Sequence, residues 1–187
     1  MAGFDVREKG SGNAGSTNML RSVGKKAAII TLLCDILKGV VAILIALIVG
    51  NIVKNVDRAV LVQIAGILVV VGHTFPIFYE FKGGKGVATS LGVIMMINWK
   101  IGLICLVFAL VIMAFSRMVS MGSVGAAILF PVLTLFMNTN FIVKTSGMKY
   151  FIFSVILAGI VVFNHRANIK RIANGTENKL SFKNTNN

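Results

Sequence analysis

Residues 72–92, GHTFPIFYEFKGGKGVATSLG, concentrate side chains that could bind an anion. The stretch holds one histidine, two lysines, one glutamate and five glycines. Its centre, Gly-Gly-Lys-Gly at 83–86, is typical of a phosphate site, because N–H groups beside glycines can approach anionic oxygens closely and a lysine adds a point charge. The spacing differs from the Gly-x4-Gly-Lys-[Ser/Thr] loop of nucleotide hydrolases, so we do not expect that activity.

A second polar stretch, GSGNAGSTNMLR at residues 10–21, is rich in glycine, hydroxyl and amide side chains and ends in Arg21. Two interpretations stay open at this point. The stretch is either a solvated leader before a membrane helix, or a loop that holds an anion with Arg21 as a bidentate clamp.

A third stretch, HRANIKR at 165–171, follows the last apolar segment. If that helix continues, His165 and Asn168 share one face. A basic anchor on the inner side of a membrane would account for the arginines and the lysine, but not for His165 and Asn168. His73 has two interpretations as well, as a histidine that ends a helix or as a group that serves the site.

Other catalytic patterns are missing from the sequence. It contains neither the Gly-x-Ser-x-Gly turn of serine hydrolases nor the His-Glu-x-x-His pair of zinc enzymes. The acidic residues are too scattered to hold a metal ion. Cys34 and Cys105 lie far apart inside apolar runs, where we expect them to be small inert side chains. We therefore predict neither a metal site nor a cofactor.

The elements that must position these residues are apolar. The 187 residues are 56% hydrophobic with a mean hydropathy of +0.86, and the apolar residues come in runs rather than in alternation. This pattern predicts a single-domain, all-α polytopic membrane protein rather than a barrel. The six predicted apolar helices cover residues 27–50, 59–81, 87–98, 101–115, 123–137 and 148–163.

Three details of these helices carry expectations. Asp35 and Lys38 lie at i, i+3 within the first helix, either as a self-neutralising ion pair or with Asp35 orienting a cationic group of the site. Pro76 should kink or end the second helix. The third helix, at 87–98, is short for a full crossing, which suggests that it is tilted, broken or re-entrant, or lengthened by the preceding loop.

The positive charges are distributed unevenly between the two sets of loops. Thirteen of the 19 Lys and Arg residues lie on the side of the leader and five on the other side. This bias predicts that the leader, 1–26, and the tail, 164–187, are cytoplasmic and flank a membrane region at 27–163. The net charge of +13 then reflects the bilayer and not nucleic acid. The same sorting brings four polar stretches together on the cytoplasmic face: 10–21, 72–86, 116–123 and 165–177.

Three of these segments resemble the signature motifs of the bacterial acyl-phosphate:glycerol-3-phosphate acyltransferases, the PlsY family. They are GSGNAGSTNMLR at 10–21, GHTFPIF at 72–78 with FKGGKGVAT at 81–89, and HRANIKRIANGTE at 165–177. Residues 33–39 and 117–123 also resemble family segments, so the similarity runs from about Gly3 to Glu177. The family has seven spanning helices with the N-terminus outside, and the first of them would precede the start of this sequence.

The resemblance implies a reaction in which the 1-hydroxyl of sn-glycerol 3-phosphate attacks a long-chain acyl phosphate. The products would be 1-acyl-glycerol 3-phosphate (lysophosphatidic acid) and phosphate, in the first step of phospholipid synthesis. It also implies a bacterial cytoplasmic membrane, an active site on the cytoplasmic side, and an acyl-phosphate synthase upstream. An acyl phosphate has a good leaving group, so positioning and charge neutralisation can supply most of the acceleration without a covalent nucleophile.

The resemblance also implies roles for individual residues. The site for glycerol 3-phosphate would comprise Ser11, Arg21, Lys85, Ser123, His165 and Asn168, of which Ser11, Lys85 and His165 are candidate catalytic residues. A further set would cradle the acyl phosphate or shape the pocket: Gly12, Asn13, Thr17, Asn18, Gly83, Gly84 and Gly86. His73 would be structural or would support the leaving phosphate. The general base is either His165 or the phosphate of the substrate.

Two rival functions remain to be compared with this one. A transporter for phosphate or organophosphate would more often place polar residues near the midplane in both halves of the chain. An acyl-CoA-dependent acyltransferase usually carries a His-x4-Asp pair, but Phe78 and Lys170 occupy the positions where that aspartate would stand.

Overall fold

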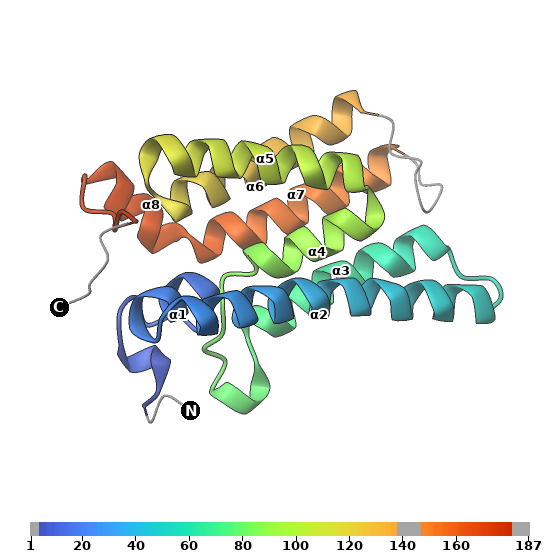
Figure 1. Ribbon diagram of the computed structural model, residues 1–187. Helices are drawn as coiled ribbons and strands as arrows, with labels where there is room; N and C mark the ends of the chain where they lie inside the picture. Colours follow the sequence, from blue (N-terminus) through green and yellow to red (C-terminus); the bar gives the residue numbers. More distant parts are fainter. Residues whose placement is uncertain (1–3, 138–146, 181–187) are drawn as a thin grey trace.

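The computed structural model describes residues 4–137 and 147–180, which form eight α-helices and two short 3-10 helices (Figure 1). The elements in chain order are η1 (Val6–Glu8), α1 (Ser16–Ser22), α2 (Lys25–Ile52), α3 (Arg58–Thr74), η2 (Ile77–Tyr79), α4 (Val87–Ile97), α5 (Trp99–Ser116), α6 (Val119–Phe136), α7 (Gly147–Asn164) and α8 (Arg166–Ala173).

The six predicted apolar helices are confirmed as α2 to α7. Five of them are long and apolar enough to cross a membrane, and α4 is the shorter one, with 11 residues. As expected from Pro76, helix α3 stops at Thr74 and the chain continues into η2. Most of the loop predicted at 138–147 lies outside the described residues.

Two predicted boundaries are wrong. The second helix was expected to extend to residue 81, but α3 ends at Thr74. Residues 116–123 were expected to form a polar break, but only Arg117 and Met118 separate α5 from α6. Arg117 takes a left-handed conformation with φ 58°, which turns the chain within two residues. Ser120 and Ser123 therefore lie on the first turns of α6, with fixed directions toward the interior.

Helix α4 lies in the middle of the bundle, where it packs against α2, α3 and α5 (Figure 1). The contact with α2 is close because two glycines face it. A Cβ atom on Gly39 would lie 2.5 Å from the carbonyl oxygen of Thr89, and one on Gly92 would lie 2.3 Å from that of Ile36. On the other side α7 packs against α3 and α6, around a cluster of Phe130, Tyr150 and Phe153.

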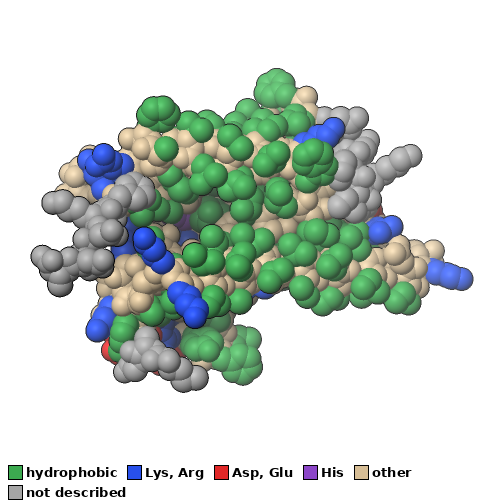
Figure 2. Space-filling model, in the orientation of Figure 1, with side chains coloured by type: hydrophobic (Ala, Val, Ile, Leu, Met, Phe, Trp, Pro, Cys, Tyr) green, Lys and Arg blue, Asp and Glu red, His purple; other side chains and the backbone are tan. Residues whose placement is uncertain are grey.

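The distribution of apolar and basic side chains on the surface is that of a protein embedded in a bilayer. Apolar side chains cover the middle of the face shown in Figure 2, and basic side chains gather toward the two ends. Helices α1 and α8 and the segments around η1 and η2 lie at one end of the bundle, and the turn between α2 and α3 lies at the other (Figure 1).

Candidate active site

A cavity of about 540 Å³ opens at the end of the bundle that carries α1 and α8. Each of the four polar stretches contributes to its wall, so their predicted convergence is confirmed. Its polar and charged lining residues are Ser11, Asn13, Ser16, Thr17, Arg21, Asp35, His73, Lys85, Ser90, Ser120, Ser123, His165, Asn168 and Glu177. Gly86 also lines the cavity. Figure 2 shows a recess between α5 and α2 in which basic and histidine side chains are visible.

Lys85 stands directly before α4. Gly86, with φ +83°, makes the turn into the helix, and no side chain caps the helix start. The first N–H groups of α4 therefore lack a side-chain partner beside a lysine, an arrangement that favours an anion. Burial lowers the pKa of Lys85 to about 8, and the nearby guanidinium of Arg171 acts in the same direction.

Asn168 holds Lys85, and Glu177 in turn holds Asn168. The ammonium group of Lys85 donates a hydrogen bond to Oδ1 of Asn168. Nδ2 of Asn168 donates to Oε1 of Glu177 at 2.7 Å, and the same oxygen accepts from Ser120 Oγ at 2.7 Å. Arg171 Nε donates to the second carboxylate oxygen at 2.8 Å.

Glu177 and Ser120 are among the polar lining residues that the sequence analysis did not single out, together with Ser16 and Ser90. Burial alone would raise the pKa of the Glu177 carboxyl, but hydrogen bonds from Ser120, Asn168 and Arg171 outweigh burial and lower it. One signal was available, because Glu177 is the only acidic residue in the basic tail from residue 164 onward.

His165 is buried at the junction of α7 and α8, and the geometry defines its tautomer. Its Nδ1 lies 2.7 Å from the carbonyl oxygen of Val161. Since a carbonyl can only accept, Nδ1 must carry the proton, which leaves Nε2 as a hydrogen-bond acceptor. Burial lowers the pKa of His165 to about 4, so the ring is neutral near pH 7.

Asp35 is buried on α2 beside both Lys38 and His73. Its Oδ1 lies 2.7 Å from Lys38 Nζ, which confirms the expected ion pair, and 3.4 Å from His73 Nδ1. Asp35 and His73 also line a second cavity, under the N-terminal segment. The contact with His73 agrees with the alternative in which Asp35 orients a site residue.

The rest of the first cavity is an apolar groove between α2, α4, α5, α6 and α7. Its lining residues are Leu32, Ile36, Leu91, Ile94, Cys105, Leu106, Ala109, Leu110, Met113, Ala126, Ala127, Phe130, Leu157, Ala158 and Val161. The cavity thus joins a cationic, hydrogen-bonding end to a hydrocarbon-like end. Within residues 4–137 and 147–180, no group of three His, Cys, Asp or Glu side chains could hold a metal ion.

A sequence model of one family, described as glycerol-3-phosphate acyltransferase, matches residues 1–175. This chain belongs to the glycerol-3-phosphate acyltransferase family.

Curated members of the family are similar along almost the whole chain. The glycerol-3-phosphate acyltransferase of Thermoanaerobacter sp. (strain X514) is 44% identical over 181 residues, which cover 96% of this chain and 84% of the relative. That of Clostridioides difficile (strain 630) is 43% identical over 183 residues, covering 98% of this chain and 85% of the relative.

Solved structures agree. The crystal structure of PlsY (YgiH), an integral membrane glycerol 3-phosphate acyltransferase, in its glycerol 3-phosphate form superposes with a TM-score of 0.83 at 32% identity, covering 96% of this chain and 84% of that one. Its lysophosphatidic acid form gives a TM-score of 0.78 at 32% identity, covering 91% and 81%. The resemblance carried by the three motifs is thereby confirmed, and the chain is a multi-pass integral membrane acyltransferase.

Four of the residues expected at the site of this acyltransferase do not line the main cavity: Gly12, Asn18, Gly83 and Gly84. The N–H groups of Gly83 and Gly84 donate to the carbonyl oxygens of Thr74 and His73, at 3.1 and 3.2 Å. These two N–H groups therefore finish helix α3 and are not open to an anion. Of the two roles expected for these glycines, this geometry favours the shaping of the pocket.

Asn18 is also structural in the acyltransferase. Its buried amide accepts from the N–H of Ser11 at 2.7 Å and donates to the carbonyl oxygens of Val6 and Lys9 at 2.9 and 3.0 Å. Gly12, with φ +69°, turns the same loop. These contacts fix the loop that presents Ser11 to the cavity.

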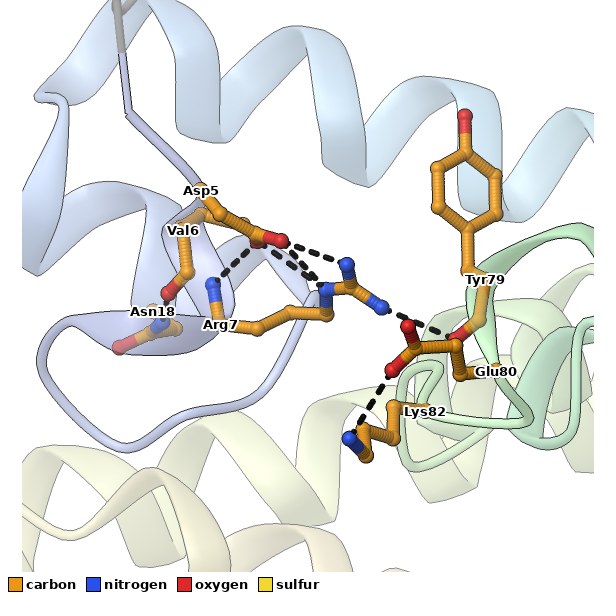
Figure 3. A network of polar contacts seen from close by, with 7 residues as sticks. All are labelled: Asp5, Val6, Arg7, Asn18, Tyr79, Glu80 and Lys82. Atoms are coloured by element: carbon orange, nitrogen blue, oxygen red, sulfur yellow. Dashed lines mark hydrogen bonds and ion pairs between the residues drawn. The ribbon is translucent and has the colours of Figure 1, made fainter.

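The N-terminal loop is in turn tied to the segment between α3 and α4. Figure 3 shows Arg7 held by Asp5 and donating to the carbonyl oxygen of Tyr79 at 2.9 Å. Close by, Lys82 pairs with Glu80 at 3.1 Å. Asn13 adds a bond to the carbonyl oxygen of Gly83 at 3.2 Å. The first two sequence motifs of the family thus form one connected wall.

Proposed function

We propose that this acyltransferase moves a fatty acyl group from an acyl phosphate to the 1-hydroxyl of sn-glycerol 3-phosphate, giving 1-acyl-sn-glycerol 3-phosphate and inorganic phosphate. The observation that carries the proposal is the two-part cavity. Its polar end suits a water-soluble phosphate, and its apolar groove suits a lipid tail. An enzyme that joins these two substrate classes needs both environments within one site.

Glycerol 3-phosphate binds at the polar end in this proposal. Arg21 and Lys85 supply positive charge, and Ser11 and Ser123 supply hydroxyl groups. The carboxylate of Glu177 does not compete for Lys85, because Arg171, Ser120 and Asn168 already occupy its oxygens. A bound phosphate would raise the pKa of Lys85 and keep its ammonium group charged.

The acyl phosphate places its chain in the groove and its phosphate near the start of α4. The 1-hydroxyl oxygen attacks the acyl carbon, the bond between that carbon and the bridging oxygen breaks, and phosphate leaves with the electron pair. The enzyme supplies position and charge, since the mixed anhydride already carries a good leaving group. His73, on the wall shared with the second cavity, supports the leaving phosphate.

The proton of the attacking hydroxyl has two candidate acceptors. Nε2 of His165 is unprotonated and can accept it, but a pKa of about 4 makes this imidazole a weak base. The phosphate of glycerol 3-phosphate is the stronger base of the two, because its second pKa is about 6 by analogy with other phosphate monoesters. We infer that the substrate phosphate removes the proton and that His165 orients the hydroxyl.

The distribution of charge supports a cytoplasmic site. Of the 17 Lys and Arg residues in the part of the chain that the structure describes, 12 belong to segments at the end of the bundle that carries the cavity. By the positive-inside rule this end faces the cytoplasm of a bacterial cell, where glycerol 3-phosphate is available. A soluble or membrane-associated synthase must then deliver the acyl phosphate from the same side.

The test uses purified protein in detergent with labelled glycerol 3-phosphate and one acyl donor at a time. With palmitoyl phosphate, we expect a labelled lipid and an equal amount of released phosphate. Palmitoyl-CoA should give no product. Product from palmitoyl-CoA alone would refute the proposed donor. Accumulation of label inside proteoliposomes without any lipid product would favour transport instead.

A further inference from the structure

The apolar groove ends at a closed floor. Along α4, α5, α6 and α7, the lining residues furthest from the polar end are Ile94, Cys105, Phe130 and Leu157, and all four are buried. Behind Phe130, the rings of Phe153 and Tyr150 pack edge-on, with centroids 6.1 and 6.0 Å away. The packed core below the floor leaves the chain no continuation in that direction.

The groove is shallow compared with a long acyl chain. Ser123 and Phe130 are seven residues apart on α6, so the floor lies about 10 Å below the polar groups. The eight residues between His165 and Leu157 give about 12 Å. With C–C bonds of about 1.5 Å, an extended chain advances about 1.3 Å per carbon, so the groove holds roughly eight or nine carbons. A palmitoyl chain is about twice that long.

The groove also has a side opening. Leu32 on α2 and Leu110 on α5 line the cavity and yet remain 39% and 54% exposed at the outer surface. The two helices that carry them border the recess seen in Figure 2. Each lies about 10 Å from the polar end of its helix, at a depth that belongs to the hydrocarbon of the bilayer.

We propose that the acyl chain leaves the enzyme sideways through this portal, defined by Leu32 and Leu110. The carbons nearest the carbonyl lie in the groove, Phe130 turns the chain aside, and the remaining carbons stay in the lipid. The portal also lets the membrane-borne donor enter and the acylated product leave without passing through water. This assignment rests on the proposed acyl transfer, and it identifies which part of the substrate the protein contacts.

The portal predicts a specific pattern of chain-length dependence. Leu32→Trp and Leu110→Trp narrow the opening. They should lower kcat/KM for palmitoyl phosphate about tenfold relative to octanoyl phosphate, whose chain ends inside the groove. Leu33→Trp and Leu103→Trp are matched controls, because these residues lie on the same two helices and are 53% and 42% exposed but do not line the cavity. The controls should leave the ratio unchanged.

A substitution at the floor of the groove tests the alternative, in which the acyl chain ends inside the groove. Phe130→Leu deepens the groove, and the portal proposal expects no change in the palmitoyl to octanoyl ratio. A ratio that responds to Phe130→Leu but not to Leu32→Trp or Leu110→Trp would show that the chain ends at the floor, and would overturn the proposal. Wild-type protein that acylates glycerol 3-phosphate from neither donor would instead refute the proposed function.

A second measurement distinguishes a narrowed portal from a misfolded variant. Glycerol 3-phosphate affinity, measured by calorimetry, depends on the polar end and should match wild type in every portal variant. If a tryptophan variant loses this affinity, Leu32→Phe and Leu110→Phe insert less bulk and should lower the ratio in the same direction. An unchanged ratio in well-folded phenylalanine and tryptophan variants would refute the portal.

Discussion

The ammonium group of Lys85 donates a hydrogen bond to the amide oxygen of Asn168, although the two residues are 83 positions apart in the chain. The partner is a neutral amide, so Lys85 keeps its positive charge for a phosphate and is not paired with a carboxylate. Asn168 is oriented in turn by Glu177, which accepts from its Nδ2. The start of α4 and the start of α8 are thereby held together at the polar end of the cavity.

The first prediction concerns the charge of Lys85. Lys85→Met keeps an unbranched side chain of similar length but removes the cation, and we expect acyl transfer to fall at least about 100-fold, as for other groups that stabilise charge in a transition state. Lys82→Met is the matched control, because Lys82 is exposed, pairs with Glu80 and does not line the main cavity. Its rate should stay within about twofold of wild type. Equal losses in the two variants would show that the loop needs general positive charge rather than Lys85.

The second prediction concerns pH. The pKa of Lys85 is about 8, so the free enzyme loses this charge as pH rises through 8. The value of kcat/KM for glycerol 3-phosphate should therefore decline above about pH 8. In Lys85→Arg the guanidinium stays charged, and the decline should disappear even if the absolute rate is lower. An alkaline decline that persists unchanged in the arginine variant would assign it to another group.

The third prediction concerns Glu177, whose carboxylate accepts from Ser120, Asn168 and Arg171. Glu177→Gln keeps the shape but turns one acceptor into a donor, so at least one of these buried bonds is lost. We expect a destabilisation of about 1–3 kcal/mol and a loss of activity larger than the loss of folded protein, because Asn168 is no longer oriented.

Asp57→Asn is the control for this variant. Asp57 caps α3 and pairs with Lys149 at the opposite end of the bundle. Its substitution should lower the unfolding temperature slightly and leave kcat unchanged. Activity per folded molecule, measured after gel filtration, separates the two effects. If Glu177→Gln loses activity only in proportion to folded protein, Glu177 has no positioning role.

The sequence was sufficient for those parts of the fold that depend on hydrophobicity and on local breakers. Runs of apolar residues predicted α2 to α7, and Pro76 predicted the end of α3. The start of α6 was misplaced, because serines suggested a loop. Ser120 and Ser123 are tolerated in this helix because one bonds Glu177 and the other bonds the carbonyl oxygen of Val119. Neither partner could be identified from spacing alone.

The glycines show a second limit of prediction. The Gly-Gly pair beside Lys85 signals a close approach of the backbone, and the structure has one, since a Cβ atom on Gly84 would lie 2.0 Å from His73 Nε2. The group that approaches Gly84 is a side chain of the protein, however, and not an anionic ligand. Only the packing of the loop on α3 reveals this. By contrast, Lys85 and His165 could be predicted to lie together, because each belongs to a segment that resembles a motif of the acyltransferase family, and both line the cavity.

The last prediction concerns the crossing of α2 and α4, which sets the position of Lys85 at the start of α4. Gly39→Ala and Gly92→Ala each place a methyl group against a backbone carbonyl that cannot turn away, so the helices must separate. We expect a loss of about 1–3 kcal/mol in the free energy of unfolding, seen as a lower unfolding temperature in one detergent. Gly159→Ala on α7 meets nothing within 4 Å and should be neutral or stabilising by up to about 1 kcal/mol. Because both helices contribute to the lining of the groove, the crossing variants should also raise the KM for acyl phosphate more than that for glycerol 3-phosphate. A Gly39→Ala protein as stable as Gly159→Ala would mean that the two helices are not in close contact in the membrane.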